Sequence, residues 1–225
     1  MRELLKTEHL SVSFFTKSGE VEAVRDVSLT VEEGEVLAIV GESVGIVGES
    51  GCGKSALCKS IMKLLPKTAK IKSGKILADG IDITDYTERN MSRLRGELFS
   101  MIFQDPMTSL NPTMTIGKQI EEAVRIHNKK MPKKQVKEKV LELMQLVEID
   151  EPEVRISQYP HEFSGGMRQR AVMAIALAGN PKILFADEPT TALDVTIQAQ
   201  ILDVFRRIQK KLGMATVFIS HDLGV

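Results

Sequence analysis

The fold is decided by one stretch of the sequence, Gly48-Glu49-Ser50-Gly51-Cys52-Gly53-Lys54-Ser55. It fits the phosphate-binding loop pattern G-x-x-x-x-G-K-[ST]. The apolar residues Val44–Val47 come directly before it and predict a buried strand. The residues after it predict a helix over Lys54–Leu65, which ends before Pro66. A loop between a strand and a helix is the context that this motif needs.

The residue types in this loop suit the phosphate chain of a nucleoside triphosphate such as ATP. Its glycines let the backbone approach phosphate without a Cβ, and the amides of the loop and of the new helix point at the anion. In such loops the lysine, here Lys54, reaches the β- and γ-phosphates, and the hydroxyl of Ser55 binds Mg²⁺. We therefore assign one continuous segment to nucleotide binding: Gly48, Glu49, Ser50, Gly51, Cys52, Gly53, Lys54, Ser55 and Ala56.

Composition and charge exclude several classes of protein. The 225 residues, 43% of them apolar, are enough for one large or two small domains. Basic and acidic residues number 30 each, so the net charge is zero, which argues against a general nucleic-acid binder. No apolar stretch is long enough to span a bilayer, and Met1–Lys6 lacks the apolar core of a signal peptide.

The two cysteines, Cys52 and Cys58, lie in the loop and in the helix after it. A disulfide between them would distort the loop, so we expect free thiols in a reducing cytosol. A redox-sensing role for Cys52 is a further possibility that the sequence leaves open.

The first part of the chain predicts two antiparallel strands, Leu4–Phe15 and Val21–Val31, joined by a turn at Lys17–Glu20. The sequence leaves two interpretations of Phe14, near the end of the first strand: it stacks on a nucleobase, or it is an aromatic residue of the core. Later, Leu98–Phe103 predicts a buried strand that ends at Gln104. In open α/β sheets, ligands bind at the carboxyl ends of the strands.

The middle of the chain predicts a helical subdomain inserted into the α/β core. Helices are expected over Thr115–Asn128 and Lys133–Val147, and the apolar residues of the second recur at helical spacing. The lysines in and just before the second helix predict a solvated face, with contact to lipid headgroups or to a partner loop as the alternative. These lysines are Lys129, Lys130, Lys133, Lys134 and Lys137.

A second anion site is predicted where Ser164-Gly165-Gly166 opens a helix over Met167–Ala178, with Ser164 as its N-cap. Further on, an apolar strand ends in Asp187 and Glu188. Asp187 is placed to support Mg²⁺, and Glu188, one residue later, to polarise a water molecule. The alternative is that the two acids belong to the N-cap region of a helix. A helix over Val195–Leu212 and a strand over Ala215–Ile219 follow.

Taken together, these motifs resemble those of the nucleotide-binding subunit of ATP-binding cassette (ABC) transporters. Gln104 resembles the glutamine of the Q-loop, and Phe163–Met167 the signature usually written LSGGQ, with Phe and Met as departures. Thr191–Asp194 resembles the D-loop, and His221 the switch histidine. The resemblance implies that His221 contacts the γ-phosphate, that Asp194 lies at the nucleotide, and that Glu188, His221 and Gln104 are catalytic.

Two longer stretches, Phe103–Pro112 and Tyr159–Met167, resemble the branch that imports peptides and nickel. The implied fold is an α/β P-loop NTPase, an ABC-type nucleotide-binding domain. Its expected parts are an antiparallel β subdomain over 1–35, a RecA-like core over 36–114 and 180–225, and a helical subdomain with the signature over 115–179. The implied metal ligands are Ser55, Gln104 and Asp187.

The resemblance also implies partners. Two ATP-binding subunits, identical or different, would form a head-to-tail dimer with each ATP between the Gly48–Ser55 loop of one and Ser164–Gly166 of the other. Transmembrane permease subunits would bind this dimer peripherally at the cytoplasmic face of the membrane, with a solute-binding protein acting indirectly and no nucleic acid involved.

The implied function is hydrolysis of ATP to power import of peptides or a related small solute. The alternatives are an ABC-type ATPase without a permease and a nucleotide switch that does not hydrolyse. The resemblance also implies further strands and helices after His221, so we expect the 225 residues alone to show low stability and weak ATPase activity.

The clearest departure from the family is a near-repeat of Gly34–Val40 in Gly41–Val47. Both copies cannot occupy the one strand that leads into the phosphate loop. We expect Val44–Val47 to take the central strand in the nucleotide-competent state, with Val36–Val40 displaced or paired at an edge.

Overall fold

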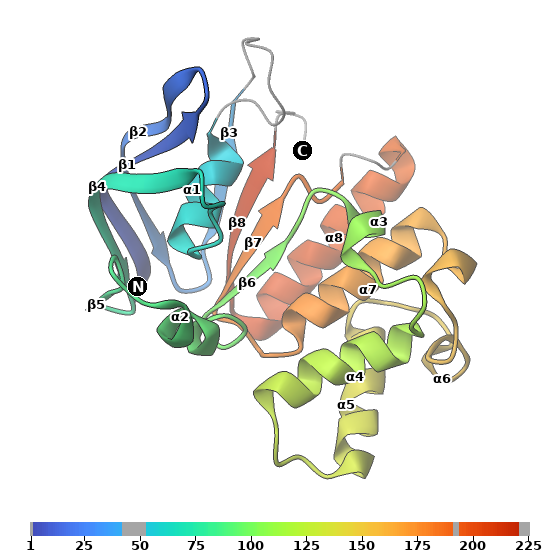
Figure 1. The fold of residues 1–225 in the computed structure, drawn as a ribbon. Coiled ribbons are helices and arrows are strands. Elements are labelled where there is room, and N and C mark those ends of the chain that lie inside the picture. Colours follow the sequence, from blue (N-terminus) through green and yellow to red (C-terminus); the bar gives the residue numbers. More distant parts are fainter. Residues whose placement is uncertain (1, 42–52, 191–193, 221–225) are drawn as a thin grey trace. The chain divides into compact units, whose positions relative to one another are not determined.

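The computed structural model describes residues 2–41, 53–190 and 194–220 (Figure 1). The chain divides into two compact units. The first unit comprises Met1–Arg95 and Ala215–Val225, and the second comprises Gly96–Met214. The second unit therefore joins the helices expected as a subdomain over 115–179 with two strands that we assigned to the core.

An antiparallel sheet forms most of the first unit, in the order β2-β1-β4-β5. The strands are β1 (Glu3–Thr16), β2 (Gly19–Glu32), β4 (Ala69–Ala78) and β5 (Ile81–Asp82). The hairpin of β1 and β2 is confirmed. The expected end of this subdomain at residue 35 is wrong, because β4 pairs with β1 along most of its length and brings residues 69–82 into the same sheet.

A glycine in β4 adapts the sheet to a bulge in β1. The register of β1 against β4 slips between Glu8 and Ser11. Gly74 has φ +94 there, and a Cβ on it would meet the carbonyl oxygen of His9 at 2.5 Å. Both the left-handed backbone and the close approach of the two strands require glycine at this point.

The first unit also contains a parallel pair, β3 (Val36–Val40) with β8 (Ala215–Ser220), and two helices, α1 (Lys54–Ile61) and α2 (Glu88–Leu94). The first copy of the near-repeat forms β3, which among the described strands pairs only with β8 and so lies at a sheet edge, the second of the two placements expected for it. The second copy, Val44–Val47, lies outside the described residues. Which copy precedes the phosphate loop when nucleotide is bound stays a prediction.

The second unit contains a second parallel pair, β6 (Phe99–Ile102) with β7 (Ile183–Asp187). The rings of Phe99 and Phe185 pack with their centroids 6.0 Å apart. Its helices are α3 (Pro106–Ser109), α4 (Ile116–His127), α5 (Lys133–Leu146), α6 (Pro152–Arg155), α7 (Gly165–Leu177) and α8 (Val195–Leu212), with a 3-10 turn over Pro160–Glu162. None of the described helices is long and apolar enough to cross a membrane.

Apolar spacing predicted the buried faces of these helices. All members of the expected face of α5 are buried, namely Val136, Val140, Leu143, Met144 and Val147. In α8 the central positions Ile201, Val204 and Ile208 are buried, whereas Leu212 is 38% exposed. Ile197, which has the same helical spacing, is half-buried, so the apolar spacing of α8 extends beyond its fully buried part at both ends.

A charged cluster holds the end of α5 against two other helices. Arg170 of α7 donates from Nη1 to the carbonyl oxygen of Glu148 at 2.6 Å. Arg207 of α8 donates from Nη2 to the carboxylate of the same residue at 2.9 Å. A cation is favourable at the C-terminal end of a helix, where carbonyl groups lack partners within the helix. Glu148 thus joins α5, α7 and α8.

Candidate functional site

Gly53, directly before α1, is fixed by both conformation and space. It has φ 78 and ψ −11, in the left-handed region, and its Cβ would meet the carbonyl oxygen of Ala23 in β2 at 1.9 Å. No side chain caps the helix, and its first turn contains no acidic residue. The start of α1 thus carries no acidic side chain that would repel a phosphate ligand at this helix N-terminus.

Lys54 lies at the carboxyl end of β3, where its Nζ donates to the carbonyl oxygen of Gly41. Beside it is a cavity of about 390 Å³ between β2 and α1. This cavity is lined by Glu22, Ala23, Val24, Arg25, Val27, Ile39, Gly53, Lys54 and Leu57. Ser55 and Ala56 follow in the first turn of α1 and are half-buried. The remaining loop residues, Gly48–Cys52, lie outside the described residues.

The aromatic residues at the end of β1 differ in their surroundings. Phe14 is half-buried. Phe15 is 40% exposed, and its ring centroid lies 6.0 Å from Nζ of Lys70 and 5.6 Å from Nζ of Lys72. Phe15 is therefore in cation–π contact, which the sequence did not predict. Stacking of Phe14 on a nucleobase stays a prediction.

The carboxyl ends of β6 and β7 bring two predicted catalytic residues together. Gln104, just after β6, donates from Nε2 to Oε2 of Glu188, just after β7, at 2.9 Å. Asp187, the last residue of β7, is only 3% exposed. The sequence placed these side chains at the ends of strands, but it did not indicate that the amide and the carboxylate are hydrogen-bonded.

Glu188 has φ 47, in the left-handed region that residues other than glycine, asparagine and aspartate rarely adopt. Such a conformation costs about 1–3 kcal/mol, and strained residues of this kind cluster at functional sites. The strain and the hydrogen bond from Gln104 together fix where this carboxylate lies.

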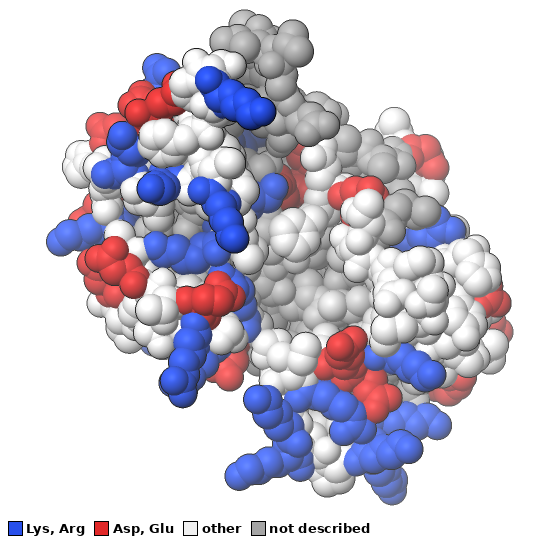
Figure 2. Space-filling view, in the orientation of Figure 1, with Lys and Arg blue, Asp and Glu red and all other residues white. Residues whose placement is uncertain are grey.

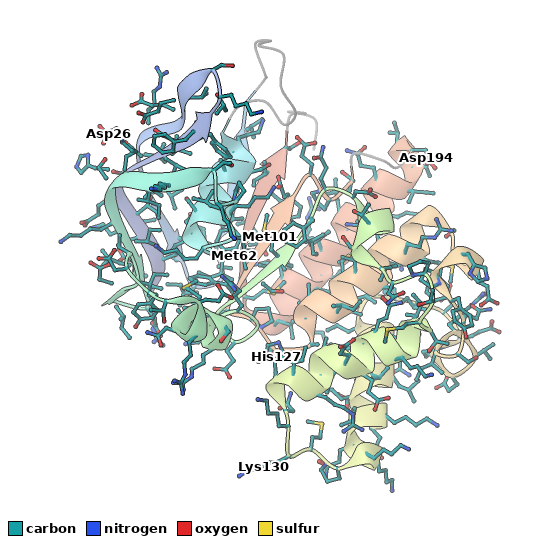
Figure 3. All side chains as sticks on the ribbon, in the orientation of Figure 1. Asp26, Met62, Met101, His127, Lys130 and Asp194 are labelled. Atoms are coloured by element: carbon teal, nitrogen blue, oxygen red, sulfur yellow. The ribbon has the colours of Figure 1, made fainter. Side chains whose placement is uncertain are left out.

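Two further helix starts carry predicted site residues. Oγ of Ser164 accepts from the amide of Met167 at 3.4 Å, so its prediction as an N-cap is confirmed. The helix begins at Gly165 rather than Met167, so Gly165 and Gly166 form its first turn. Asp194 caps α8 through Oδ1, which accepts from the amide of Ile197 at 3.0 Å (Figure 3). His221 and residues 191–193 lie outside the described residues.

The residues expected to bind Mg²⁺ supply oxygen donors of the type that this ion prefers. They are a hydroxyl in the first unit, Ser55, and a carboxylate and an amide in the second, Asp187 and Gln104. Since Gln104 directs its amide nitrogen at Glu188, its carbonyl oxygen is the atom suited to a cation. Among the described residues, no group of three or more His, Cys, Asp or Glu side chains could hold a metal. Each of these oxygen donors is of a type that suits Mg²⁺.

Comparison with protein families decides which family the chain belongs to. Residues 24–191 match the model of the family described as ABC transporter. The chain belongs to the ABC transporter family. It is 53% identical over 223 residues to the oligopeptide transport ATP-binding protein OppD of Bacillus subtilis, covering 99% of this chain and 60% of that protein. It is 52% identical to the dipeptide transport ATP-binding protein DppD of Lactococcus lactis, covering 99% of this chain and 62% of that protein. The chain thus spans about three fifths of the length of these relatives.

A solved member of the ABC family has the same fold. It is a dimeric ATP-binding cassette in a post-hydrolysis state bound to ADP and Pi, 26% identical to this chain with a TM-score of 0.81. The alignment covers 98% of this chain and 89% of that one. The expected class, an ABC-type P-loop α/β fold with an additional antiparallel sheet, is therefore confirmed.

Proposed function

We propose that this ABC family member binds and hydrolyses ATP to power the import of peptides or a related small solute. The observation that carries hydrolysis is the hydrogen bond from Gln104 to Glu188 beside the buried Asp187. The printed names of the relatives, which concern oligopeptide and dipeptide transport, support the class of solute.

Binding is assigned to the loop and to the start of α1. Residues 48–56 would surround the phosphates, with the ammonium of Lys54 as a point charge against them. Ser55, Asp187 and Gln104 would hold Mg²⁺, which when bound neutralises charge on the phosphate oxygens. The left-handed Gly53 supports this assignment because it lets the backbone at the start of α1 lie close to β2 without a Cβ in the way.

Hydrolysis is assigned to Glu188 as the residue that orients water and accepts its proton. A carboxylate is suited to this role because attacking water must share or lose a proton. The amide of Gln104 holds one oxygen of Glu188 by a hydrogen bond, so the other oxygen keeps a defined direction. Gln104 thus acts on the water through Glu188 as well as on the metal. His221 is expected to complete this set.

The second anion site is assigned to a second subunit. Ser164–Gly166 and Asp194 would face the nucleotide held by the phosphate loop of the other chain, in a homodimer or a heterodimer. The dimeric state of the solved relative supports this arrangement. Permease subunits at the cytoplasmic face of the membrane would bind the dimer, and a solute-binding protein would act through them.

The test is Glu188→Gln in the full chain. We expect ATP binding to persist and phosphate release to fall by about 100-fold or more, because a general base contributes about 10²–10⁴-fold. The dimer should then be trapped with ATP. The matched control is Glu153→Gln, an exposed carboxylate of α6. Unchanged turnover in Glu188→Gln would remove Glu188 from the mechanism.

The two alternative functions give different results. A nucleotide switch would bind ATP and release no phosphate even without a substitution. An ATPase without a permease would hydrolyse ATP but would not co-purify with membrane subunits from its source.

A further inference from the structure

The second unit has a cavity that is separate from every residue assigned to nucleotide. It has a volume of about 450 Å³ and lies among the start of α4, the first turns of α5 and the residue after α6. Its lining consists of Thr115, Gly117, Lys118, Glu121, Lys133, Lys134, Lys137 and Ile156. Figure 2 shows Lys and Arg side chains gathered over α4, α5 and the loop between them.

The floor of this lysine-lined pocket is formed by Gly117 and Ile156, which lie in close contact. The amide of Gly117 in α4 donates to the carbonyl oxygen of Ile156 at 3.0 Å. A Cβ on Gly117 would meet the carbonyl oxygen of Ile156 at 2.5 Å and its Cγ1 at 2.2 Å, so this close approach requires glycine. The base of the pocket is thus formed by a close contact between the start of α4 and the residue after α6.

Among the described residues, no ion pair neutralises the lysines of the pocket. Its one lining carboxylate, Glu121, is paired with Arg125, whose Nε lies 2.7 Å from Oε1. In the described parts of the chain, no ion pair joins a carboxylate to the lysines that line the pocket, which are Lys118, Lys133, Lys134 and Lys137.

The helix dipole of α5 adds to this charge. Lys133 and Lys134 are its first two residues, Pro132 provides no side-chain cap, and the first turn has no acid. Cations are unfavourable at the N-terminal end of a helix, and Lys133 and Lys137 form a like-charge pair at i,i+4. The first amides of α4 are not available to an anion, because the amides of Ile116 and Gly117 donate to backbone carbonyl oxygens. A bound anion would relieve the repulsion at α5.

We propose that this pocket binds a phosphate group, carried by a lipid headgroup or by a small soluble phosphorylated compound. Four lysines favour a multiply charged anion over a single carboxylate. The lysine stems and Ile156 give the walls an apolar lining that suits the organic part of such a ligand. The proposal is independent of ATP hydrolysis, because it involves none of the residues assigned to that reaction.

The experiment has two arms, both with the full chain and without nucleotide. In the first, the chain is sedimented with phosphatidylcholine vesicles with and without phosphatidic acid. In the second, glycerol 3-phosphate is titrated by calorimetry. Binding only to vesicles with phosphatidic acid assigns the phosphate to lipid, and binding of glycerol 3-phosphate assigns it to a soluble compound. Binding in neither arm overturns the proposal.

Substitutions then locate the site. Lys133→Gln with Lys134→Gln should weaken binding at least about tenfold, since each lysine near an anionic surface contributes roughly fivefold. Glu121→Gln should strengthen binding because it removes a negative charge from the pocket. The matched control is Lys139→Gln, which is also on α5 but pairs with Glu142 at 3.3 Å and should bind as the unchanged chain does.

A second pair of lysine substitutions distinguishes binding in the pocket from binding to a diffuse basic surface. Lys129 and Lys130 are exposed in the loop between α4 and α5 and do not line the pocket (Figure 3 labels Lys130). Lys129→Gln with Lys130→Gln should weaken binding less than the pocket pair does. Equal losses in the two pairs would overturn the pocket as the site. A melting curve of each variant checks that the fold is retained.

Discussion

Two helices of this chain, α1 and α7, begin at glycine-rich sequences, yet they begin in different ways. Before α1 stands Gly53, left-handed and without a side-chain cap. Before α7 stands Ser164, with φ −65 and ψ 166, and its hydroxyl accepts from an amide of the first turn. At α1 the backbone itself forms the turn, so a Cβ is not tolerated. At α7 the side chain of Ser164 caps the helix, so the backbone there needs no left-handed residue. The cap contributes only modestly to the free energy of unfolding.

The largest expected effect is that of Gly53→Ala. A left-handed alanine costs about 1–2 kcal/mol, and its Cβ must also move away from the carbonyl oxygen of Ala23, 1.9 Å distant. We expect ATP affinity to fall by about 100-fold or more, which corresponds to about 3 kcal/mol. Calorimetric titration with ATP measures it.

The matched control is Gly213→Ala, after α8. Gly213 is also left-handed, with φ 63, but a Cβ there has open space within 4 Å. This variant should lose only the free energy needed to hold alanine in a left-handed conformation, about 1 kcal/mol of stability. Its affinity for ATP should be unchanged. Similar losses in the two variants would mean that the close approach to β2 is unimportant.

The next effect in size is that of Lys54→Ala. It removes a charge that faces the phosphates, and a charged hydrogen bond contributes about 1.5–3 kcal/mol, so ATP affinity should fall about 10–100-fold. Lys59→Ala, in the last turn of α1, is the control and should bind ATP normally. If both variants bind ATP equally, the assignment of Lys54 is wrong.

A smaller effect is expected at the start of α7. Ser164→Ala removes the hydrogen bond to Met167 and should lower the free energy of unfolding by about 1 kcal/mol. Asp194→Ala removes the equivalent bond at α8 and should cost about the same. Thermal or urea unfolding measures both losses. A loss above 3 kcal/mol at Ser164 would contradict a simple cap.

The smallest effect is expected from deleting Gly41–Val47, which leaves one strand sequence before the loop that leads into α1. If the two copies compete equally for that position, only half of the molecules are competent and the apparent ATP affinity is about twofold too low. The deletion variant should bind ATP about twofold more tightly and melt at a higher temperature. No improvement in either property would show that the near-repeat is harmless.

The sequence predicted what depends on local patterns. The bounds of α8, Val195–Leu212, are those expected, because its apolar spacing is a signal within one segment. The cap formed by Asp194 was missed although its signal, an acid just before an apolar helix, was present.

Pairing between distant segments could not be predicted. Nothing local in Ala69–Ala78, which contains several lysines and Gly74, identifies β1 as its partner. Gln104 and Glu188 are 84 residues apart, and their hydrogen bond depends on which strands become neighbours. The lysines of α5 were visible in the sequence, but the floor that Gly117 and Ile156 give them depends on how α4 and α6 pack.

The cluster at Glu148 affects how the second unit opens. Since Arg170 and Arg207 both hold this residue, the last turn of α5 cannot separate from α7 without also loosening α8. In hydrogen–deuterium exchange, amides of these three helices should therefore lose protection together, as one cooperative segment. Arg207 is 57% exposed and salt screens exposed ion pairs, so high ionic strength should make this shared opening more frequent.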